Sequence, residues 1–473
     1  MAAVDDPPEA DAPDERDSHA NGQSAQPPTH GKSIPVNALS RGFKLAALPV
    51  GFAGRTTLGV GKRLAGAPAE AVLLEIQRRT ADQLFTVLGQ LKGGAMKFGQ
   101  AMSIFEAALP DEIAKPYRET LTKLQDAAPS MPPSVVHRVM TEEFGPNWRE
   151  QFPTFDDAPA AAASIGQVHR ATWRESPGAE PIDVAVKLQY PGAGKALRSD
   201  LRQLARFGRV FALIAPAVDV EGIIEELQVR VIEELDYGRE AENQNSFADA
   251  YADDPDIVIP RAVASTDHAL VTTWMDSTGS LADIIANGTK QERDHFGGLY
   301  IHFLFTGPAR VGLLHADPHP GNYRILKSGQ LGIVDFGAVD RLPHGVPPEL
   351  GRLVRLAVEE SPAELEQELR RLGFLRPNAN LSTEAIARYV RPFTDPAQTE
   401  EFTFSRGWIR GQVTRVSAPT ADGMGTSMRI NLPREYVMLH RVAAGGIGVL
   451  SQLGATVRVP DVLAESLPGY ADD

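Results

Sequence analysis

His315-Ala-Asp-Pro-His-Pro-Gly-Asn322 and Gly332-Ile-Val-Asp-Phe-Gly337 are the two stretches that decide the expected fold of this chain. They carry an acid, an amide and a second acid, because Asn322 follows Asp317 by five positions and Asp335 follows Asn322 by thirteen. The residues between them read as two short strands joined by a turn. Such a hairpin would bring the three side chains together, as a phosphoryl-transfer site requires.

The spacing of these polar residues matches the motif set of protein kinases. On that pattern Asp317 would orient or deprotonate the phosphoryl acceptor, while Asn322 and Asp335 would hold one or two Mg²⁺ ions. The alternative is a transition-metal site, because His315-x-Asp-x-His319 contains three potential ligands. That alternative explains neither the Asn nor the Asp-Phe-Gly, so we expect the two histidines to brace the loop by hydrogen bonds.

An upstream turn and strand complete the expected nucleotide site. The strand Pro181–Tyr190 alternates with period two and turns Lys187 away from its apolar face. A small-residue loop followed by a strand ending Val-Ala-Val-Lys matches the phosphate-covering loop and phosphate-pairing lysine of kinases. We therefore expect Lys187 to contact the α and β phosphates of ATP. The loop residues expected to lie along the nucleotide are Ala161, Ala162, Ala163 and Ser164.

The segment Gly192–Tyr251 has a helical pattern dense in carboxylates, most of which we expect to form a solvated face. A kinase needs one helix glutamate to hold its strand lysine, and Glu226 or one of its neighbours is the candidate. The carboxylates in question are Glu221, Glu225, Glu226, Glu233, Glu234, Asp236, Glu240 and Glu242. Beyond them, His268–Asp276 reads as a buried strand that leads into a linker where an adenine would meet backbone groups.

Composition limits the class of protein. The chain has 473 residues, 42% of them hydrophobic, which is enough for a large core in two or three domains or one bilobed unit. A formal charge of −14 argues against a broad nucleic-acid-binding surface. The absence of cysteine excludes disulfides, thiolate zinc sites and cysteine nucleophiles.

Targeting signals are not expected. The first residues are acidic, whereas a secretory signal needs a basic start and an apolar run, so we expect a cytoplasmic protein. No run of about 18 uninterrupted apolar residues occurs. The most apolar stretch, Val437–Val457, is interrupted by His440, Arg441 and several glycines and predicts a buried helix.

These patterns predict an α+β, bilobed protein-kinase-like fold with a small β-rich N-lobe and a helical C-lobe. We expect a disordered tail over residues 1–34 and an N-terminal helical extension over 35–150. The N-lobe, with inserted helices, is expected over 151–278, and the C-lobe, with the catalytic loop, over 279–473. The basic and apolar stretch Arg41–Arg63 predicts either a weak membrane-surface segment or a loosely packed lead-in helix.

One further motif lies in the expected extension. Taken alone, Lys97-Phe-Gly-Gln100 predicts only an exposed lysine on a helix. Together with the alanine loop, with Glu234-Leu-Asp236 and with the two loops quoted first, it resembles the Lys-x-Gly-Gln and Glu-x-Asp signatures of the UbiB/AarF/ADCK family of atypical kinases. The resemblance covers roughly residues 80 to 345, with the motifs in the family's order.

The resemblance implies that the N-terminal helices fold over the active site. Lys97, on one helical face with Gln100, would meet Glu234 and Asp236 and occupy the space that a protein substrate uses. Family members behave as ATPases or as unorthodox kinases of small molecules or lipids, and many support isoprenoid quinone biosynthesis at membranes. The implied partners are Mg-ATP, a lipid or isoprenoid molecule, and a membrane surface contacted peripherally.

Two features qualify this picture. No Ala-Pro-Glu anchor follows Asp335-Phe-Gly337, which agrees with the family and argues against ordinary protein phosphorylation. The linker Thr272-Thr-Trp-Met-Asp276 has Thr273 near the position where family members often carry a glutamate.

Three functions remain open from the sequence. The first is a Mg²⁺-dependent atypical kinase or ATPase. The second is a small-molecule phosphotransferase of the antibiotic-kinase type, a class that shares the catalytic loop but lacks Lys97-Phe-Gly-Gln100. The third is a nucleotide-binding scaffold without turnover that regulates a membrane-associated partner. Turnover that depends on Asp317 separates the third from the others.

Overall fold

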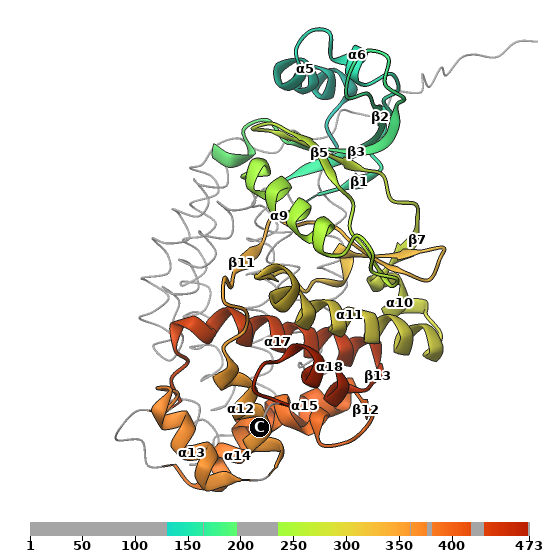
Figure 1. Cartoon of the computed structure of the whole chain (residues 1–473). Coiled ribbons are helices and arrows are strands. Elements are labelled where there is room, and N and C mark those ends of the chain that lie inside the picture. The colour runs from blue at the N-terminus through green and yellow to red at the C-terminus, as the bar shows by residue number, and fades with distance from the viewer. Residues whose placement is uncertain are drawn as a thin grey trace, which may run out of the picture.

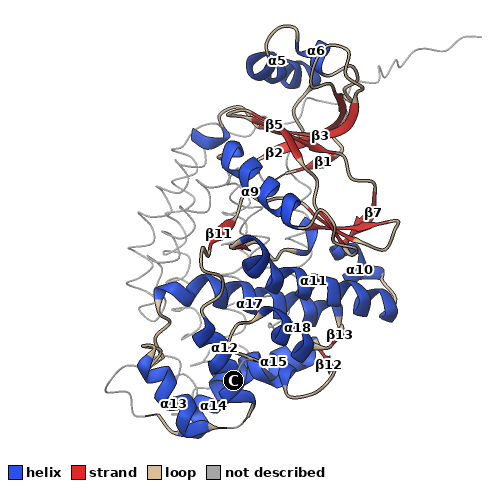
Figure 2. Ribbon diagram, viewed as in Figure 1, coloured by secondary structure: helices blue, strands red, loops and turns tan. Residues whose placement is uncertain are grey.

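The computed structural model describes residues 130–163, 165–195, 235–359, 361–375, 381–417 and 430–471. Strands lie in the upper half of the molecule and helices fill the lower half, with helix α9 (Tyr237–Ala250) between them (Figures 1 and 2). The expected bilobed, kinase-like fold with a β-rich N-lobe and a helical C-lobe is confirmed. The expected tail and the Arg41–Arg63 segment lie outside the described residues.

The N-lobe is built on a five-stranded antiparallel sheet in the order β1-β2-β3-β6-β5. Its strands are β1 (Ala161–Ala162), β2 (Gly166–Trp173), β3 (Ile182–Gln189), β5 (Ala262–Ser265) and β6 (Ala269–Thr273). The alternation expected in β3 is confirmed for Val184, Val186 and Leu188, which are fully buried, whereas Ile182, expected on the same face, is 43% exposed at the start of the strand. Lys187, between two of them, therefore points to the opposite face of the sheet.

Two helices, α5 (Pro133–Phe144) and α6 (Trp148–Gln151), pack on the apolar face of this sheet. Trp148 and Phe152 join one hydrophobic core with Trp173 of β2 and the buried residues of β3. The expected boundary at residue 150 therefore divides a segment that packs as one unit with the N-lobe.

Gly166 sits where β2 passes closest to β3. A Cβ at this position would lie 2.0 Å from the carbonyl oxygen of Leu188, so any side chain forces the two strands apart. We expect Gly166→Ala to lower the free energy of unfolding by about 1–3 kcal/mol, measured by urea denaturation. Gly298→Ala, in helix α11 (Lys290–Val311), is the matched control because a Cβ there meets open space. That variant should be neutral or slightly stabilising, and equal losses in both variants would contradict the close approach.

A second sheet lies below the first, in the order β4-β10-β9-β7. Its strands are β4 (Ile257–Val258), β7 (Ser277–Ser280), β9 (Tyr323–Leu326) and β10 (Leu331–Ile333). The hairpin expected between the two motif loops is confirmed, because β9 and β10 pair antiparallel with Tyr323 opposite Ile333. Its turn uses Gly329 at φ 88°, a conformation that glycine adopts readily. A two-stranded ribbon of β8 (Leu313–His315) and β11 (Val339–Arg341) flanks the hairpin in sequence.

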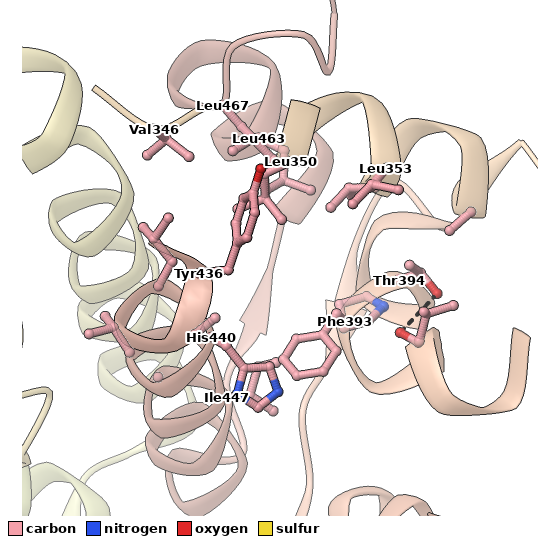
Figure 3. Close-up of a pocket in the computed structure, with 18 of the residues that line it drawn as sticks. Val346, Leu350, Leu353, Phe393, Thr394, Tyr436, His440, Ile447, Leu463 and Leu467 are labelled. Atoms are coloured by element: carbon pink, nitrogen blue, oxygen red, sulfur yellow. Dashed lines mark hydrogen bonds between the residues drawn. The ribbon is translucent and has the colours of Figure 1, made fainter. Parts of the chain in front are cut away.

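The C-lobe is helical and surrounds α11, which packs against α17 and α18. The expected buried helix is confirmed as α17, and the helices enclose an apolar cavity (Figure 3). In the part of the chain that the structure describes, no helix is long and apolar enough to cross a membrane. The remaining elements are α10 (Leu281–Asn287), η1 (Pro320–Asn322), α12 (Pro348–Val358), α13 (Pro362–Arg371), α14 (Thr383–Thr394), η2 (Asp395–Ala397), β12 (Phe402–Thr403), α15 (Arg406–Ser417), α17 (Arg434–Leu453), β13 (Thr456–Val457) and α18 (Val459–Ser466).

Helix α9 connects the two lobes and carries polar side chains on its buried face. Its first turn is capped by Asp236, whose side chain accepts a hydrogen bond from the backbone N–H of Arg239. Glu240, Asn243 and Gln244 are all buried, although a solvated face would be the usual place for such residues. Burial of this kind requires partners, and these partners define the site.

Candidate active site

The central contact of the site is an ion pair between Lys187 of β3 and Glu240 of α9. The Lys187 Nζ donates to both carboxylate oxygens of Glu240, at 2.7 and 3.0 Å. Glu240 is only 2% exposed, and the ring of Tyr237 lies 5.2 Å from the same ammonium group. Removing two charges from water costs free energy, which an ion pair offsets only when its hydrogen bonds are well formed. The two hydrogen bonds between Lys187 and Glu240 meet this condition.

The pair corrects one expectation. The sequence predicts Glu226 or one of its neighbours as the helix carboxylate, but the residue that holds Lys187 is Glu240, another carboxylate of the same segment. Glu226 itself lies outside the described residues. Several carboxylates share the same helical pattern, and only the docking of α9 under the sheet selects the one that reaches β3.

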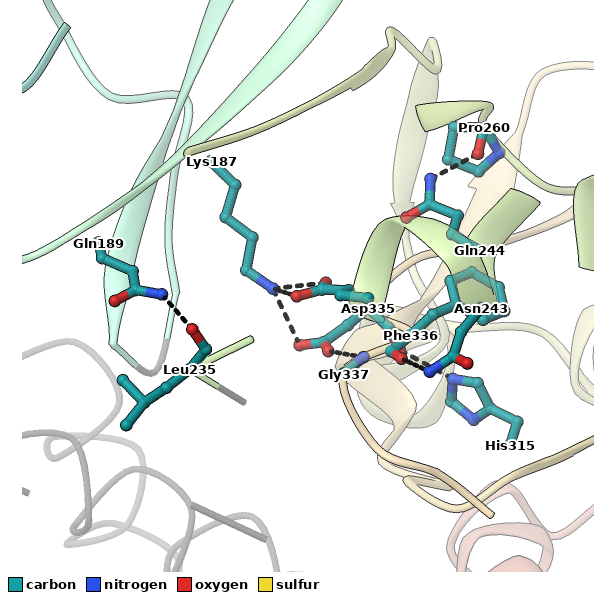
Figure 4. A network of polar contacts seen from close by, with 11 residues as sticks. Lys187, Gln189, Leu235, Asn243, Gln244, Pro260, His315, Asp335, Phe336 and Gly337 are labelled. Carbon is teal, nitrogen blue, oxygen red and sulfur yellow. Dashed lines mark hydrogen bonds and ion pairs between the residues drawn. The ribbon is translucent and has the colours of Figure 1, made fainter. Parts of the chain in front are cut away.

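A second carboxylate faces Lys187 from the C-lobe. The Oδ2 of Asp335 lies 3.9 Å from the Lys187 Nζ, in the geometry drawn in Figure 4. Burial by itself lowers the pKa of Lys187, but the negative charges of Asp335 and Glu240 outweigh it and hold the pKa above its ordinary value. Lys187 is therefore a fixed cation that joins an N-lobe strand, helix α9 and the Asp-Phe-Gly loop.

The backbone at Asp335 is unusual. With φ at 70°, it is the one non-glycine residue of the described chain in the left-handed region. Its carbonyl accepts a hydrogen bond from the Nε2 of His315 at 2.9 Å, and its Oδ1 accepts one from the N–H of Gly337 at 3.3 Å. Uncommon backbone conformations of this kind persist where surrounding contacts fix them. His315 thus braces the loop, as expected from the sequence.

Sequence reasoning missed Asn243, which lies one turn beyond Glu240 on α9. Its Nδ2 donates to the carbonyl oxygen of Phe336 at 3.2 Å, so α9 holds the loop that follows Asp335 as well as Lys187. The available signal was the i, i+3 spacing of Glu240 and Asn243, which puts both on one helical face. The next residue, Gln244, donates to the carbonyl of Pro260 (Figure 4).

The catalytic loop is tied to the same hairpin. Asn322 donates a long hydrogen bond of 3.4 Å from its Nδ2 to the carbonyl of Asp317, and its own carbonyl accepts from the N–H of Val334 at 2.9 Å. The Nδ1 of His319 accepts from the N–H of Gly321 at 3.1 Å. These contacts join the catalytic loop to the strand that leads into the Asp-Phe-Gly segment, while the meeting of the Asp317, Asn322 and Asp335 side chains stays a prediction.

The donor set fits a hard divalent cation rather than a transition metal. Among the described residues, no three His, Cys, Asp or Glu side chains come together as a metal site, which argues against the His-x-Asp-x-His alternative. Both His315 and His319 use a ring nitrogen on the backbone of the loops. Asn322 and Asp335 offer oxygen ligands, and Mg²⁺ commonly takes one or two protein oxygens together with substrate phosphates.

The alanine loop lies at the open edge of the N-lobe sheet. Ala161 and Ala162 are exposed, and a reciprocal pair of backbone hydrogen bonds between Ala163 and Gly166 closes the turn, with the Ala163 N–H at 2.9 Å from the Gly166 carbonyl. Side chains this small leave the backbone accessible to a ligand. Ser164 lies outside the described residues.

Of the four residues expected to form the contact over the active site, the structure describes Asp236. Asp236 is exposed at the start of α9, close in sequence to Glu240. Lys97, Gln100 and Glu234 lie outside the described residues, so their contact with Asp236 stays a prediction.

The linker after β6 lies against β10. A Cβ on Gly332 would lie 2.0 Å from the Sδ of Met275, so a residue without a side chain is what lets the linker approach this strand. The N–H of Trp274 donates to the carbonyl of Asp183 on β3 at 2.8 Å. Thr273, at the position where the resemblance implied a glutamate, is the last residue of β6.

Comparisons with known proteins agree with this geometry. A family model described as the ABC1 atypical kinase-like domain matches residues 123–367. The mitochondrial atypical kinase coq-8 of Caenorhabditis elegans is 26% identical over an alignment of 454 residues that covers 93% of this chain. The chain spans 58% of that protein's length. The mitochondrial atypical kinase COQ8 of Saccharomyces cerevisiae is 28% identical over 92% of this chain and 85% of its own.

One solved structure is similar to this chain, and the match covers the solved structure's whole length. Rv3197 from Mycobacterium tuberculosis, determined in complex with erythromycin, is 42% identical and superposes with a TM-score of 0.66. The match covers 86% of this chain and 100% of Rv3197. With a family model that spans more than half of the sequence, these relatives confirm the resemblance, and the chain belongs to the ABC1 family of atypical kinase-like proteins, the group of UbiB and COQ8/ADCK.

Proposed function

We propose that this protein binds Mg-ATP and transfers or hydrolyses its terminal phosphoryl group. The observation that carries the proposal is the Lys187–Glu240 ion pair, whose ammonium group faces Asp335 at 3.9 Å. Phosphoryl transfer depends on neutralising and positioning the phosphates rather than on covalent chemistry by the protein. Lys187 is a fixed cation that can neutralise phosphate charge, and Asp335 and Asn322 supply the acid and the amide that can hold a metal ion beside it.

Each residue has a distinct role in this proposal. Lys187 binds the α and β phosphates, and Asp335 and Asn322 hold Mg²⁺, which when bound offsets the negative charge of the phosphates. Asp317 orients the acceptor and takes its proton. The segment around Asp317 is anchored from below, since the hydroxyl of Tyr300 donates to the carbonyl of Pro318 at 2.8 Å.

The acceptor we propose is water or a small molecule, including a lipid, rather than a protein. The chain lacks an Ala-Pro-Glu anchor after Asp335-Phe-Gly337, and its coq-8 and COQ8 relatives are named atypical kinases. We infer that Lys97 and Gln100 meet Glu234 and Asp236 on the acceptor side, and that the protein works at a membrane surface to which it binds peripherally.

Nucleotide turnover tests the proposal. The purified full chain should release phosphate from ATP only with Mg²⁺, and vesicles of neutral and anionic phospholipid should change the rate. Asp317→Asn should abolish release while ATP still raises the melting temperature. Failure of Mg-ATP to bind would overturn the proposal. Binding with the same turnover in Asp317→Asn would reject the role of Asp317, and binding without turnover would favour the scaffold function instead.

A second candidate function rests on Rv3197, which is 42% identical over its whole length and was solved with erythromycin. We propose that this chain also binds a macrolide. Titration with erythromycin should raise the melting temperature. Mass spectrometry of erythromycin incubated with the protein and Mg-ATP then distinguishes binding from phosphorylation, because only the phosphotransferase would add a phosphoryl group.

Asn243 offers a test of how the metal ligand is positioned. Asn243→Leu keeps the branched shape of the side chain but leaves the Phe336 carbonyl without its donor. We expect the Mg²⁺ concentration needed for half-maximal turnover to rise about tenfold, because residues that orient a ligand act on metal affinity. The control is Asn245→Leu, whose side chain bonds to Ala262 instead. Equal Mg²⁺ dependence in the two variants would show that Asn243 has only a structural role.

A further inference from the structure

The helical C-lobe contains an apolar cavity of about 220 Å³, away from the phosphoryl-transfer site. Its walls come from α11, α12, α13, α14, α17 and α18, as Figure 3 shows in part. None of Lys187, Glu240, Asp317 or Asp335 lines it, and the lining residue nearest to them in sequence is Leu314. The cavity is therefore a separate feature of the fold.

A void of this size is uncommon in a folded protein. Interiors pack as densely as organic crystals, and few voids are larger than a water molecule. An apolar cavity of about 150 Å³ engineered into another protein stays dry and binds benzene. The present cavity is larger, so it has room for more than a single ring.

The chemistry of the lining selects against charged ligands. Among the described residues, no Lys, Arg, Asp or Glu lines the cavity. An ion moved into such a place loses its hydration without gaining a partner. The occupant must therefore be uncharged and mostly apolar.

The lining residues with polar side-chain groups are Tyr389, Thr394, Tyr436 and His440, and the imidazole of His440 is partly exposed. His440 of α17 lies with its ring 5.1 Å from that of Phe393 on α14, and both side chains border the cavity in Figure 3. Burial lowers the pKa of His440, so the ring is neutral near pH 7 and can accept or donate one hydrogen bond. Leu450 and Ile386 are only 1% exposed, whereas His440 and Phe393 are partly exposed. His440 thus lies towards the rim, and the deeper walls are apolar apart from the buried Thr394 and Tyr436.

We propose that this cavity binds an uncharged amphiphile, an aliphatic alcohol, with its hydrocarbon part between α11, α12, α17 and α18 and its hydroxyl group at His440. The arrangement satisfies the hydroxyl, which a purely hydrocarbon pocket would leave without a partner. The proposal does not depend on ATP turnover, because it concerns a different part of the C-lobe.

Calorimetric titration of the full chain with 1-decanol tests it, with decanoate as the charged comparator of equal length. Decanol should bind and raise the melting temperature, and decanoate should bind at least about tenfold more weakly because its charge finds no partner. Ala443→Phe, which fills the cavity from α17, should weaken decanol binding at least about tenfold. Ala444→Phe is the matched control, because its neighbouring and similarly exposed site does not line the cavity.

A second variant keeps the test decisive if Ala443→Phe does not fold. His440→Phe preserves an aromatic ring and removes the hydrogen bond, so it should weaken decanol while leaving the binding of 1-chlorodecane, which lacks the hydroxyl, unchanged. No binding of decanol to the wild-type chain would overturn the proposal. So would decanoate binding as tightly as decanol, or equal affinity in the wild type and in a folded Ala443→Phe.

Discussion

Asp335→Asn is expected to reduce Mg-ATP turnover at least about a hundredfold while the chain stays folded. The carboxylate is proposed to hold Mg²⁺ and also lies 3.9 Å from the Lys187 ammonium, so an amide removes charge from both contacts. Asn is the informative replacement because it tolerates the left-handed backbone that Asp335 adopts at φ 70°. Phosphate release at saturating ATP, with thermal melting as the check on folding, measures the effect.

The matched control for that variant is Asp340→Asn, which changes an acid on β11 five positions further along. The Asp340 side chain accepts a hydrogen bond from the N–H of Arg341 and is not part of the proposed site. Turnover should be unchanged in this variant. If Asp335→Asn hydrolysed ATP as fast as Asp340→Asn, the assignment of Asp335 as a metal ligand would be wrong.

Glu240→Ala should produce the largest loss of stability, about 3–5 kcal/mol in the free energy of unfolding. The substitution removes the carboxylate that Lys187 contacts at 2.7 and 3.0 Å and leaves the buried cation with the more distant carboxylate of Asp335. The folded-state pKa of Lys187 is raised above 10.5, so the pair stabilises fully below that pH and loses its effect only as pH rises through the folded value. Urea denaturation at pH 7 therefore measures the whole contribution.

A double variant separates stability from function. Lys187→Met with Glu240→Leu replaces both charges by apolar side chains and should regain most of the lost stability, since a buried pair can be exchanged for packed hydrocarbons. It should nevertheless bind no Mg-ATP. Glu226→Ala serves as the comparison, because the sequence predicts Glu226 or a neighbour as the partner of Lys187. A loss in Glu226→Ala as large as in Glu240→Ala would show that the pair does not depend on Glu240 alone.

The local parts of the site were predictable from the sequence. The order of Asp317, Asn322 and Asp335 and the hairpin between them follow from short spacings and turn residues, which act within a few positions of one another. The burial pattern of β3 follows from its alternation, which also fixed the direction of Lys187. The hairpin and the alternation of β3 were predictable because each depends on residues that are neighbours in one strand or turn.

The contacts between distant elements were not predictable. Glu240 is 53 positions from Lys187, and Asn243 is 93 positions from the carbonyl that it binds. Glu240 and Glu242 lie two positions apart on α9, and the angle and depth at which α9 docks bury Glu240 and leave Glu242 exposed. The same holds for α5 and α6, whose apolar residues complete the N-lobe core from outside the expected lobe boundary.

The sequence by itself therefore determined the family of fold, the catalytic loop and the residue types available for phosphoryl transfer, because periodicity and spacing are properties of neighbouring residues. Only the tertiary structure decided which carboxylate holds Lys187, how the backbone of Asp335 is supported, and that the C-lobe helices leave an apolar cavity beside His440. These depend on how side chains from separate elements pack in three dimensions, which a linear pattern does not encode.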